Sequence, residues 1–348
     1  QNVKVQVVAD QRQVGLHPEL GALHHPGRLE ADGHLLVERV HARADDFAVV
    51  AAIVMASISG SAVADTAALA ALLIPMMRQA GYRLDRSCGL IAAGGIIAPV
   101  IPPSIGFVVF GVAAGVSITR LFLAGIGPAI LLAILFSGFV MIWASLNRDK
   151  MPPPEPAPSW AERGRALGML LPTVLLIAAV IGSIYAGLAS PTEAAVIGVV
   201  GSLLIAGLSG GLDKDSFVAA LRGAAITSCM IAFILAGASF LTIAMGFTGI
   251  PRSLASMIGE MGLSPYALIA VLLVFFIIIG CFLDGISIVV LTTSVILPMV
   301  LAAGIDPIWF GIFLVLVVEM SQITPPVGFN LFVIQSITGQ NIFRIAYY

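Results

Sequence analysis

The stretch SGSAVADTAALAALLIPMMRQAG, from Ser59 to Gly81, decides the fold, because a second stretch repeats its pattern: LDGISIVVLTTSVILPMVLAAG, from Leu283 to Gly304. In both stretches a small polar cluster opens an apolar run, and a proline lies near its end, before a closing glycine. A proline pair follows each stretch, in IAPVIPPSIGF and in SQITPPVGFN. Because several features keep the same spacing in both copies, we interpret the two stretches as an internal repeat.

The repeat has a constant offset of 223 positions. Pro75 recurs as Pro298, and the proline pair that begins at Pro102 recurs at Pro325. Apolar segments broken by Gly and Pro at corresponding places of two halves are typical of secondary transporters, whose binding site lies between inverted repeats. The pattern predicts an all-α polytopic membrane protein with inverted repeats, two re-entrant hairpins and broken helices.

The composition is that of a protein surrounded by lipid. Of the 348 residues, 59% are hydrophobic and 10% are charged, whereas about 25% are charged in soluble proteins; the mean hydropathy is +1.05. A crossing helix needs about 20 apolar residues, so the shorter apolar stretches suit re-entrant segments that are buried in protein or line a water-filled cavity. The predicted membrane segments are residues 121–146, 167–188, 194–208, 226–245, 267–282, 287–303 and 309–318.

The chain divides into four segments. Residues 1–46 are polar and contain all five histidines, so we expect them not to belong to the fold and exclude them from the mechanism. Residues 47–146 form the first predicted repeat, and residues 166–348 form the second, which we expect to be truncated at its C-terminus. The proline-rich residues 147–165 predict an extended, semi-rigid cytoplasmic linker.

Positive charges set the expected orientation, because cytoplasmic loops are enriched in Lys and Arg. The loop MRQAGYRLDR, which begins at the end of the first stretch, carries Arg78, Arg83 and Arg86, and the linker is also basic, whereas the equivalent loop of the second repeat, residues 301–307, has no basic residue. We therefore expect the first hairpin to enter from the cytoplasm and the second from the periplasm. This is an inverted topology.

Several function classes have no support. The sequence has no Walker A run and no GxGxxG motif followed by an acid, so we expect neither ATP-driven transport nor a dinucleotide cofactor. A net charge of −2 without a basic run predicts no nucleic-acid partner. The three cysteines lie far apart in apolar surroundings and are interpreted as buried thiols.

The hairpin tips and the proline pairs are the candidate binding residues. A helix that ends inside the membrane leaves unpaired backbone groups and a partial charge at its end, and such ends can coordinate ions. Together with hydroxyl and carboxylate oxygens, these helix ends could coordinate Na⁺. The candidate Na⁺ ligands are Ser61, Asp284, Thr324 and Asn330. The candidate set is Ser59, Gly60, Ser61, Asp65, Pro102 and Pro103 in the first half, and Asp284, Gly285, Thr324, Pro325, Pro326, Gly328 and Asn330 in the second.

Each of these features also has a purely structural interpretation. A Gly-Ser pair often serves close helix packing, and a membrane proline often only kinks a helix. Asp65, Asp284 and Glu319 are ionisable residues in apolar segments, where a charge is costly, so they face a cavity or partner or else brace a hairpin. The recurrence in both halves favours binding. Glu193, in SPTEAA, is expected to cap a helix from its first turn.

At these residues the sequence resembles the large permease subunit of TRAP (tripartite ATP-independent periplasmic) transporters, the DctM-like proteins. The resemblance extends from about Phe47 to the end and includes the stretches SGSAVADTAAL, GLIAAGGIIAPVIPPSIGFVVFG, ASPTEAAVIGV, LDGISIVVLTTSVILPMV and GIDPIWFGIFLVLVVEMSQITPPVGFNLFV. The family pattern has further helices before the first hairpin and after the end of this chain, so we expect scaffold helices to be missing.

The resemblance implies an elevator-type Na⁺ symporter of the ion-transporter superfamily in the bacterial inner membrane. It implies organic-acid substrates such as dicarboxylates or sialic acid, a periplasmic substrate-binding protein and a small membrane subunit as partners, and it adds Ser104 to the site. A single-component carboxylate or ion exchanger of the same superfamily is the alternative. A membrane-embedded enzyme has little support, because no histidine follows His41 and no HExxH motif is present.

Overall fold

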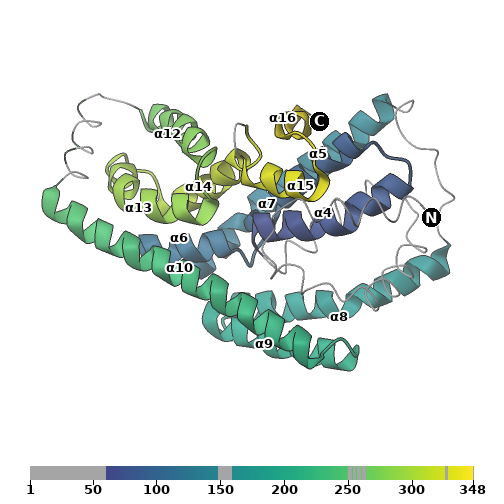
Figure 1. The fold of residues 1–348 in the computed structure, drawn as a ribbon. Coiled ribbons are helices and arrows are strands. Elements are labelled where there is room, and N and C mark those ends of the chain that lie inside the picture. Colours follow the sequence, from purple (N-terminus) through teal and green to yellow (C-terminus); the bar gives the residue numbers. More distant parts are fainter. Residues whose placement is uncertain are drawn as a thin grey trace.

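The computed structural model describes residues 60–147, 159–249, 264–325 and 328–347, together with residues 253, 256 and 260. Several predictions therefore lie outside the described residues: the N-terminal segment, Ser59, most of the linker, and Pro326. The described chain is helical throughout, with no strand among these residues (Figure 1). In chain order the helices are α4 (Ala62–Gln79), α5 (Leu84–Gly95), the 3-10 helix η2 (Ala98–Val100), α6 (Ile105–Ala114), α7 (Ile118–Leu146), α8 (Trp160–Tyr185), α9 (Pro191–Leu208), α10 (Lys214–Thr248), α12 (Pro265–Gly280), α13 (Gly285–Ala302), α14 (Pro307–Ser321), α15 (Phe329–Thr338) and α16 (Ile342–Tyr347).

Helix length separates two kinds of apolar segment. In the part of the chain that the structure describes, four helices are long and apolar enough to cross a membrane by themselves: α7, α9, α10 and α13. The apolar helices α6, α12, α14 and α15 have 10 to 16 residues, too few to span a hydrocarbon core alone. The prediction of a helical membrane protein is confirmed.

Local sequence signals explain where helix α9 begins. Ser190 and Glu193 form a capping box at the start of α9, because the Ser190 hydroxyl accepts from the Glu193 N–H while the Glu193 carboxylate accepts from the Ser190 N–H at 2.7 Å. The predicted capping role of Glu193 is thus confirmed. Helix α8 begins at Trp160, so the last residues of the predicted linker are helical.

The first halves of the two repeats have the same helix bounds. Helices α4 and α13 both contain 18 residues, and their ends lie 223 positions apart. Each is followed by a left-handed glycine, Gly81 with φ 89° and Gly304 with φ 74°. The N–H of Tyr82 bonds the carbonyl of Met77, and the N–H of Ile305 bonds that of Val300, so the turn is built alike in both halves. Helices α5 and α14 also start 223 positions apart.

After the proline pairs the correspondence continues with an offset of 224. Helices α6 and α15 each have ten residues, and each ends at a left-handed glycine, Gly115 or Gly339. The next helices, α7 and α16, begin after Ser117 and Asn341 respectively. The second half therefore has one residue more than the first between its proline pair and the helix that follows.

Helices of one half also pack against the equivalent helices of the other half in a reciprocal way. Helix α4 packs against α15, and its counterpart α13 packs against α6, the counterpart of α15. Helix α5 packs against α15 and α16, while α14 packs against α6 and α7. Figure 1 shows α4 beside α15. Each half thus completes its packing with the broken helix of the other half, as a two-fold relation between them requires.

This exchange creates two apolar cores. One core joins Leu69 and Leu73 of α4 to Leu331 and Ile334 of α15. The other joins α6, α7, α12, α13 and α14, and contains Phe110 and Phe310 with ring centroids 6.2 Å apart. Burial of such side chains contributes about 1.5–3 kcal/mol each in water, and within lipid close packing replaces this driving force.

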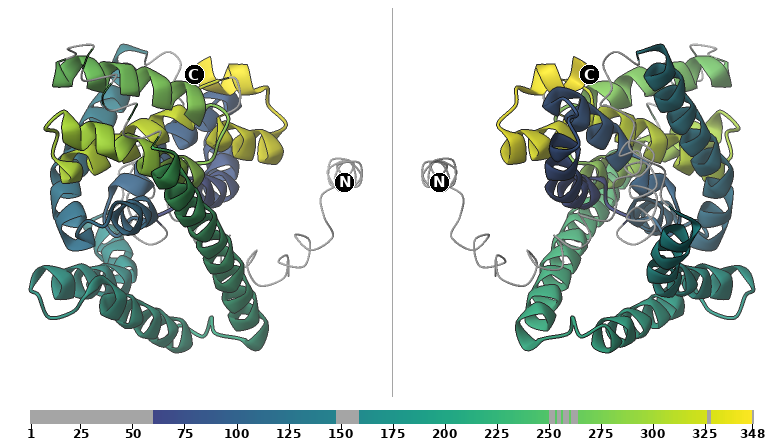
Figure 2. Two further views of the ribbon diagram at one scale, coloured as in Figure 1. Left: turned by 90° about the vertical axis from the view of Figure 1, so that its left-hand side faces the viewer. Right: turned by 90° about the vertical axis from the view of Figure 1, so that its right-hand side faces the viewer.

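Helices α8 to α10 lie at the periphery of the described chain (Figure 2). Helix α8 packs against α9, and α10 packs against α13. Much of their apolar surface is exposed, as at Val199, Phe233 and Phe240. Cys229 of α10 is exposed as well, so the prediction of a buried thiol is wrong at this position, whereas Cys88 and Cys281 are buried. Exposed apolar side chains of this kind fit contact with lipid or with another membrane subunit.

Candidate functional site

The first proline pair breaks a helix as the sequence predicts. Helix α5 ends at Gly95, the short helix η2 contains Pro99, and α6 begins only at Ile105. Pro102 and Pro103 lie in the irregular segment between them, because proline lacks the N–H that helix continuation requires. The buried hydroxyl of Ser104 then starts α6 by accepting from the Phe107 N–H at 3.3 Å.

The first hairpin tip touches this break. Gly60 has φ +60°, and a Cβ added to it would lie 2.7 Å from the carbonyl oxygen of Pro103 and 3.2 Å from the N of Ile105. Only glycine fits both the left-handed conformation and this approach of two backbone segments. Ser61 follows as the N-cap residue of α4. The start of α4 and the break of the first half therefore lie together.

One turn into α4, two polar side chains are fully buried. Asp65 donates its backbone N–H to the Ser61 carbonyl at 2.9 Å, and its side chain has no exposed surface. Its neighbour Thr66 is also buried, and its hydroxyl fills the space where residue 95 would carry a side chain if it were not glycine. Sequence reasoning missed Thr66, although a hydroxyl beside Asp65 in an apolar helix was an available signal.

The second hairpin tip is the turn between α12 and α13. A carboxylate oxygen of Asp284 accepts from the Ser287 N–H at 3.0 Å, so Asp284 caps α13. A Cβ added to Gly285 would lie 2.7 Å from Nε2 of Gln322 and 3.6 Å from Oε1 of Glu319. The second tip therefore lies against the end of α14, directly before the second break.

The second break runs from the end of α14 to the start of α15. The carbonyl of Gln322 accepts from the Asn330 N–H at 3.2 Å, and Gly328 adopts φ +55° close to that same carbonyl. The Thr324 hydroxyl donates to the carbonyl of Met320 at 2.9 Å. The carbonyl of Pro325 faces the Cys281 thiol of the second tip at 3.6 Å.

Several buried polar atoms near the tips and breaks lack a hydrogen-bond partner among the described residues. They share positions at or beside a break, and an unpaired buried polar group costs about 1–3 kcal/mol. A cation or substrate at the site would satisfy such atoms. They are the Thr66 hydroxyl, one carboxylate oxygen of Glu319, the side-chain carbonyl of Gln322 and both amide atoms of Asn330.

The available donor atoms are hydroxyl, amide, carboxylate and backbone carbonyl oxygens. Among the described residues, no group of three His, Cys, Asp or Glu side chains is placed to hold a metal ion. The contacts divide the predicted Na⁺ ligands: Ser61 belongs to the first tip, whereas Asp284, Thr324 and Asn330 belong to the second tip and break. Gln322, absent from the prediction, lies between the second tip and the second break.

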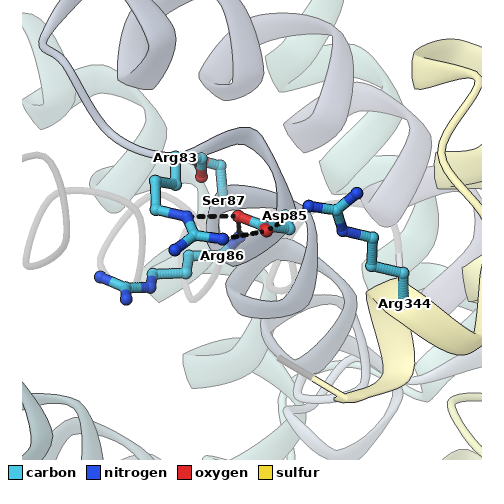
Figure 3. A network of polar contacts seen from close by, with 5 residues as sticks. All are labelled: Arg83, Asp85, Arg86, Ser87 and Arg344. Atoms are coloured by element: carbon cyan, nitrogen blue, oxygen red, sulfur yellow. Dashed lines mark hydrogen bonds and ion pairs between the residues drawn. The ribbon is translucent and has the colours of Figure 1, made fainter. Parts of the chain in front are cut away.

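A charged network lies at the loop between α4 and α5. The buried Asp85 carboxylate accepts from Arg83 at 2.8 Å, from the Arg86 N–H at 3.1 Å and from Arg344 at 3.2 Å. Figure 3 shows Arg83 and Arg344 on opposite sides of Asp85. Burial by itself would raise the pKa of Asp85, but the hydrogen bonds and charge of Arg83, with those from Arg86 and Arg344, lower the pKa below 3.8. The Arg86 guanidinium lies 4.8 Å from the ring of Trp143, near the end of α7.

The sequence model of one protein family, described as "Tripartite ATP-independent periplasmic transporter, DctM component", matches residues 35–348. The chain is 38% identical over 293 residues to the 2,3-diketo-L-gulonate TRAP transporter large permease protein YiaN of Escherichia coli, covering 83% of this chain and 68% of that protein. It is 33% identical over 295 residues to the C4-dicarboxylate TRAP transporter large permease protein DctM of Pseudomonas aeruginosa, covering 84% and 68% respectively. It is 36% identical over 280 residues to the ectoine/5-hydroxyectoine TRAP transporter large permease protein UehC of Ruegeria pomeroyi, covering 79% and 64%.

Proposed function

The chain belongs to the DctM family of TRAP transporter large permease proteins in the inner membrane, and we propose that it imports small organic acids by Na⁺ symport. The observation that carries this proposal is the closure of each hairpin tip onto a broken helix, at Gly60 against Pro103 and at Gly285 against Gln322. Helix breaks inside a membrane protein supply the backbone oxygens that coordinate Na⁺, and partial positive charges that attract an anionic substrate.

We propose that the two halves are related by an axis in the membrane plane and move as an elevator. The exchange of packing partners between α4 and α13, and between α15 and α6, supports a two-fold relation. The opposite charge character of the loops 80–83 and 303–306 supports the orientation of that axis, because only the first contains an arginine. In this arrangement the two tips approach the midplane from opposite faces.

The substrate class follows from the relatives. Their names specify 2,3-diketo-L-gulonate, C4-dicarboxylates and ectoine, and another relative carries isethionate. These compounds are small, polar and bear a carboxylate or sulfonate group. We propose that an anionic group of the substrate binds at the tips, at the N-termini of α4 and α13.

The proposed partners are a periplasmic substrate-binding protein and a small membrane subunit. The exposed apolar surfaces of α9 and α10 would then contact that subunit or lipid. The single-component exchanger remains the alternative function. The symporter and the exchanger differ in their need for a binding protein, because a single-component exchanger transports substrate without one.

Uptake into proteoliposomes tests the proposal. The full-length permease is reconstituted with its small subunit, and radiolabelled C4-dicarboxylate, 2,3-diketo-L-gulonate and ectoine are offered with and without the binding protein and an inward Na⁺ gradient. We expect uptake of an organic acid, and we expect this uptake to require both the binding protein and the Na⁺ gradient. Uptake that needs neither the binding protein nor Na⁺ would reject the proposal in favour of the exchanger.

A further inference from the structure

The carboxyl group of Glu319 is buried at the second hairpin tip, and no ion pair joins it to a cationic side chain of the described residues. Its residue is 7% exposed, and one carboxylate oxygen has no hydrogen-bond partner among the described residues. The other oxygen lies 3.6 Å from the point where Gly285 would carry a Cβ. Glu319 therefore faces the tip from the last turn of α14 before the break.

The charged groups on the surrounding helices do not neutralise it. Helix α14 packs against α6, η2, α7, α12 and α13, and in these elements Arg120 is the one cationic residue. Arg120 is exposed, and its neighbour Leu121 contacts α14 at Gly311, which is eight residues and roughly 12 Å along the helix from Glu319. The nearby acid is Asp284, the N-cap of α13, and Asp306 caps the far end of α14.

The side chain of Gln322 indicates which ion Glu319 holds. Gln322 follows Glu319 by three residues on the same helix face, and its side-chain carbonyl also lacks a donor among the described residues. One added proton turns a Glu319 oxygen from an acceptor into a donor, so that an unpaired acceptor gains a partner. A sodium ion would need several oxygen ligands and open space, whereas side-chain atoms of Gln322 and Val318 already lie 2.7 and 3.2 Å from the point where Gly285 would carry a Cβ.

We propose that Glu319 is a proton-binding site: its carboxyl is protonated while the second tip is closed, as in this structure, and releases the proton when the tip opens. The charged form is disfavoured in the closed tip because it would be buried without a cationic partner among the described residues. The opened tip admits water, which solvates the carboxylate. The transport cycle thus includes a proton-linked step at a residue separate from the proposed Na⁺ ligands.

This inference rests on the proposed function only in assigning the tip to a transport cycle, so its test does not measure transport. Infrared spectroscopy of the purified full chain at pH 7, without Na⁺, compares the wild type with Glu319→Gln and with Asp306→Asn. We expect a protonated-carboxyl band in the wild type and in Asp306→Asn that is absent from Glu319→Gln. The same band in all three proteins, or a Glu319 signal that appears as carboxylate, overturns the proposal.

A second measurement uses the native Cys281, which lies in the second tip and is 5% exposed. Its labelling by a thiol reagent, relative to that of the exposed Cys229 in the same molecule, reports opening of the tip independently of thiol reactivity. Because only the closed tip holds the proton, the ratio of open to closed tips should rise with pH, by up to about tenfold per pH unit. We expect this rise in the wild type and in Asp306→Asn, and a flat ratio in Glu319→Gln; an equal rise in all three contradicts the proposal.

Discussion

Arg344 donates a hydrogen bond to the buried carboxylate of Asp85 over 3.2 Å, and thereby joins α16 of the second half to α5 of the first. The residue equivalent to Arg344 in the first half is Arg120, which is exposed at the start of α7. The residue equivalent to Asp85 in the second half is Ile308. The ionic contact therefore exists at one end of the protein without a counterpart built from the same residue types at the other.

Removal of this contact should lower stability. Arg344→Ala leaves the buried Asp85 carboxylate with fewer donors, and we expect a loss of about 1 kcal/mol, because the arginine is partly exposed and solvent screens part of the attraction. The matched control is Arg120→Ala, which removes the equivalent exposed arginine and should change stability by less than about 0.5 kcal/mol. Thermal unfolding of both purified variants measures the difference. Equal melting temperatures for the two variants would contradict a stabilising role of Arg344.

The same carboxylate predicts a dependence of stability on acid. Because the pKa of Asp85 is lower in the folded protein than its ordinary value of 3.8, its contribution is fully present above that value and disappears as the pH falls through the folded pKa. We expect the wild type to lose stability more steeply than Asp85→Asn as the pH falls below about 4. Unfolding curves between pH 3 and pH 6 measure this, and parallel curves for the two proteins would rule the contribution out.

The two tip glycines should differ in their tolerance of alanine. Gly60→Ala adds a Cβ at 2.7 Å from a backbone oxygen of Pro103 and imposes a left-handed conformation on a non-glycine residue, so we expect loss of both stability and transport. Gly285→Ala meets the side chain of Gln322 instead, and a side chain can move. Thermal unfolding and uptake should rank Gly60→Ala as the more damaging substitution.

A third glycine, Gly115, separates the two effects expected for Gly60→Ala, which are backbone strain and the contact with Pro103. Gly115 has φ +67°, and a Cβ added there meets nothing within 4 Å. Gly115→Ala should therefore cost only the strain of a left-handed alanine, about 1–2 kcal/mol. If Gly60→Ala costs no more than Gly115→Ala, the contact between the first tip and Pro103 does not restrict the position.

The sequence predicted the helix breaks because their cause is local. Single prolines are tolerated inside helices here, as Pro75 is in α4 and Pro298 in α13. Two successive prolines remove two backbone donors, so the pairs that begin at Pro102 and Pro325 favour a break, and the chain is broken between α5 and α6 and between α14 and α15. Glycine at Gly81 and Gly304 is local in the same sense, because it permits the left-handed turn after each helix.

The contacts between distant segments could not be predicted in this way. Asp85 and Arg344 are 259 positions apart, and nothing in the neighbouring residues indicates their pairing. Gln322 was missed because its importance depends on the tip that packs against it. The change of offset from 223 to 224 was also missed, since the proline pairs align at 223 and the extra residue lies after them.

Sodium dependence should respond to the charge of Asp284 rather than to its capping role. Asp284→Asn keeps a side-chain oxygen that can accept from the Ser287 N–H but removes the carboxylate. We expect this variant to keep its melting temperature and to need on the order of tenfold more Na⁺ for half-maximal uptake, equivalent to about 1.4 kcal/mol. Thr324→Ala, which removes one oxygen, should shift the Na⁺ requirement in the same direction.

A further variant separates the capping role of Asp284 from its proposed role as a Na⁺ ligand. Asp284→Ala removes both functions, and its additional cost should appear as a stability loss of about 1 kcal/mol beyond that of Asp284→Asn. Uptake whose Na⁺ dependence is unchanged in Asp284→Asn and in Thr324→Ala would place the ion elsewhere.

The last prediction concerns the orientation of the repeats. Gln79 and Ala302 are the final residues of α4 and α13, both are exposed, and they occupy equivalent positions 223 residues apart. A cysteine at either position leaves the Asp85 network and the left-handed glycines intact. If the halves are inverted, membrane-impermeant thiol reagents should label Gln79→Cys only from the cytoplasm and Ala302→Cys only from the periplasm, because the first loop carries the arginines and the second has none. The exposed Cys229 and the buried Cys88 and Cys281 are replaced by serine in both variants, so that each reports a single site. Labelling of both positions from one face would reject the inverted arrangement, and with it the proposal that the two tips reach the binding site from opposite sides of the membrane.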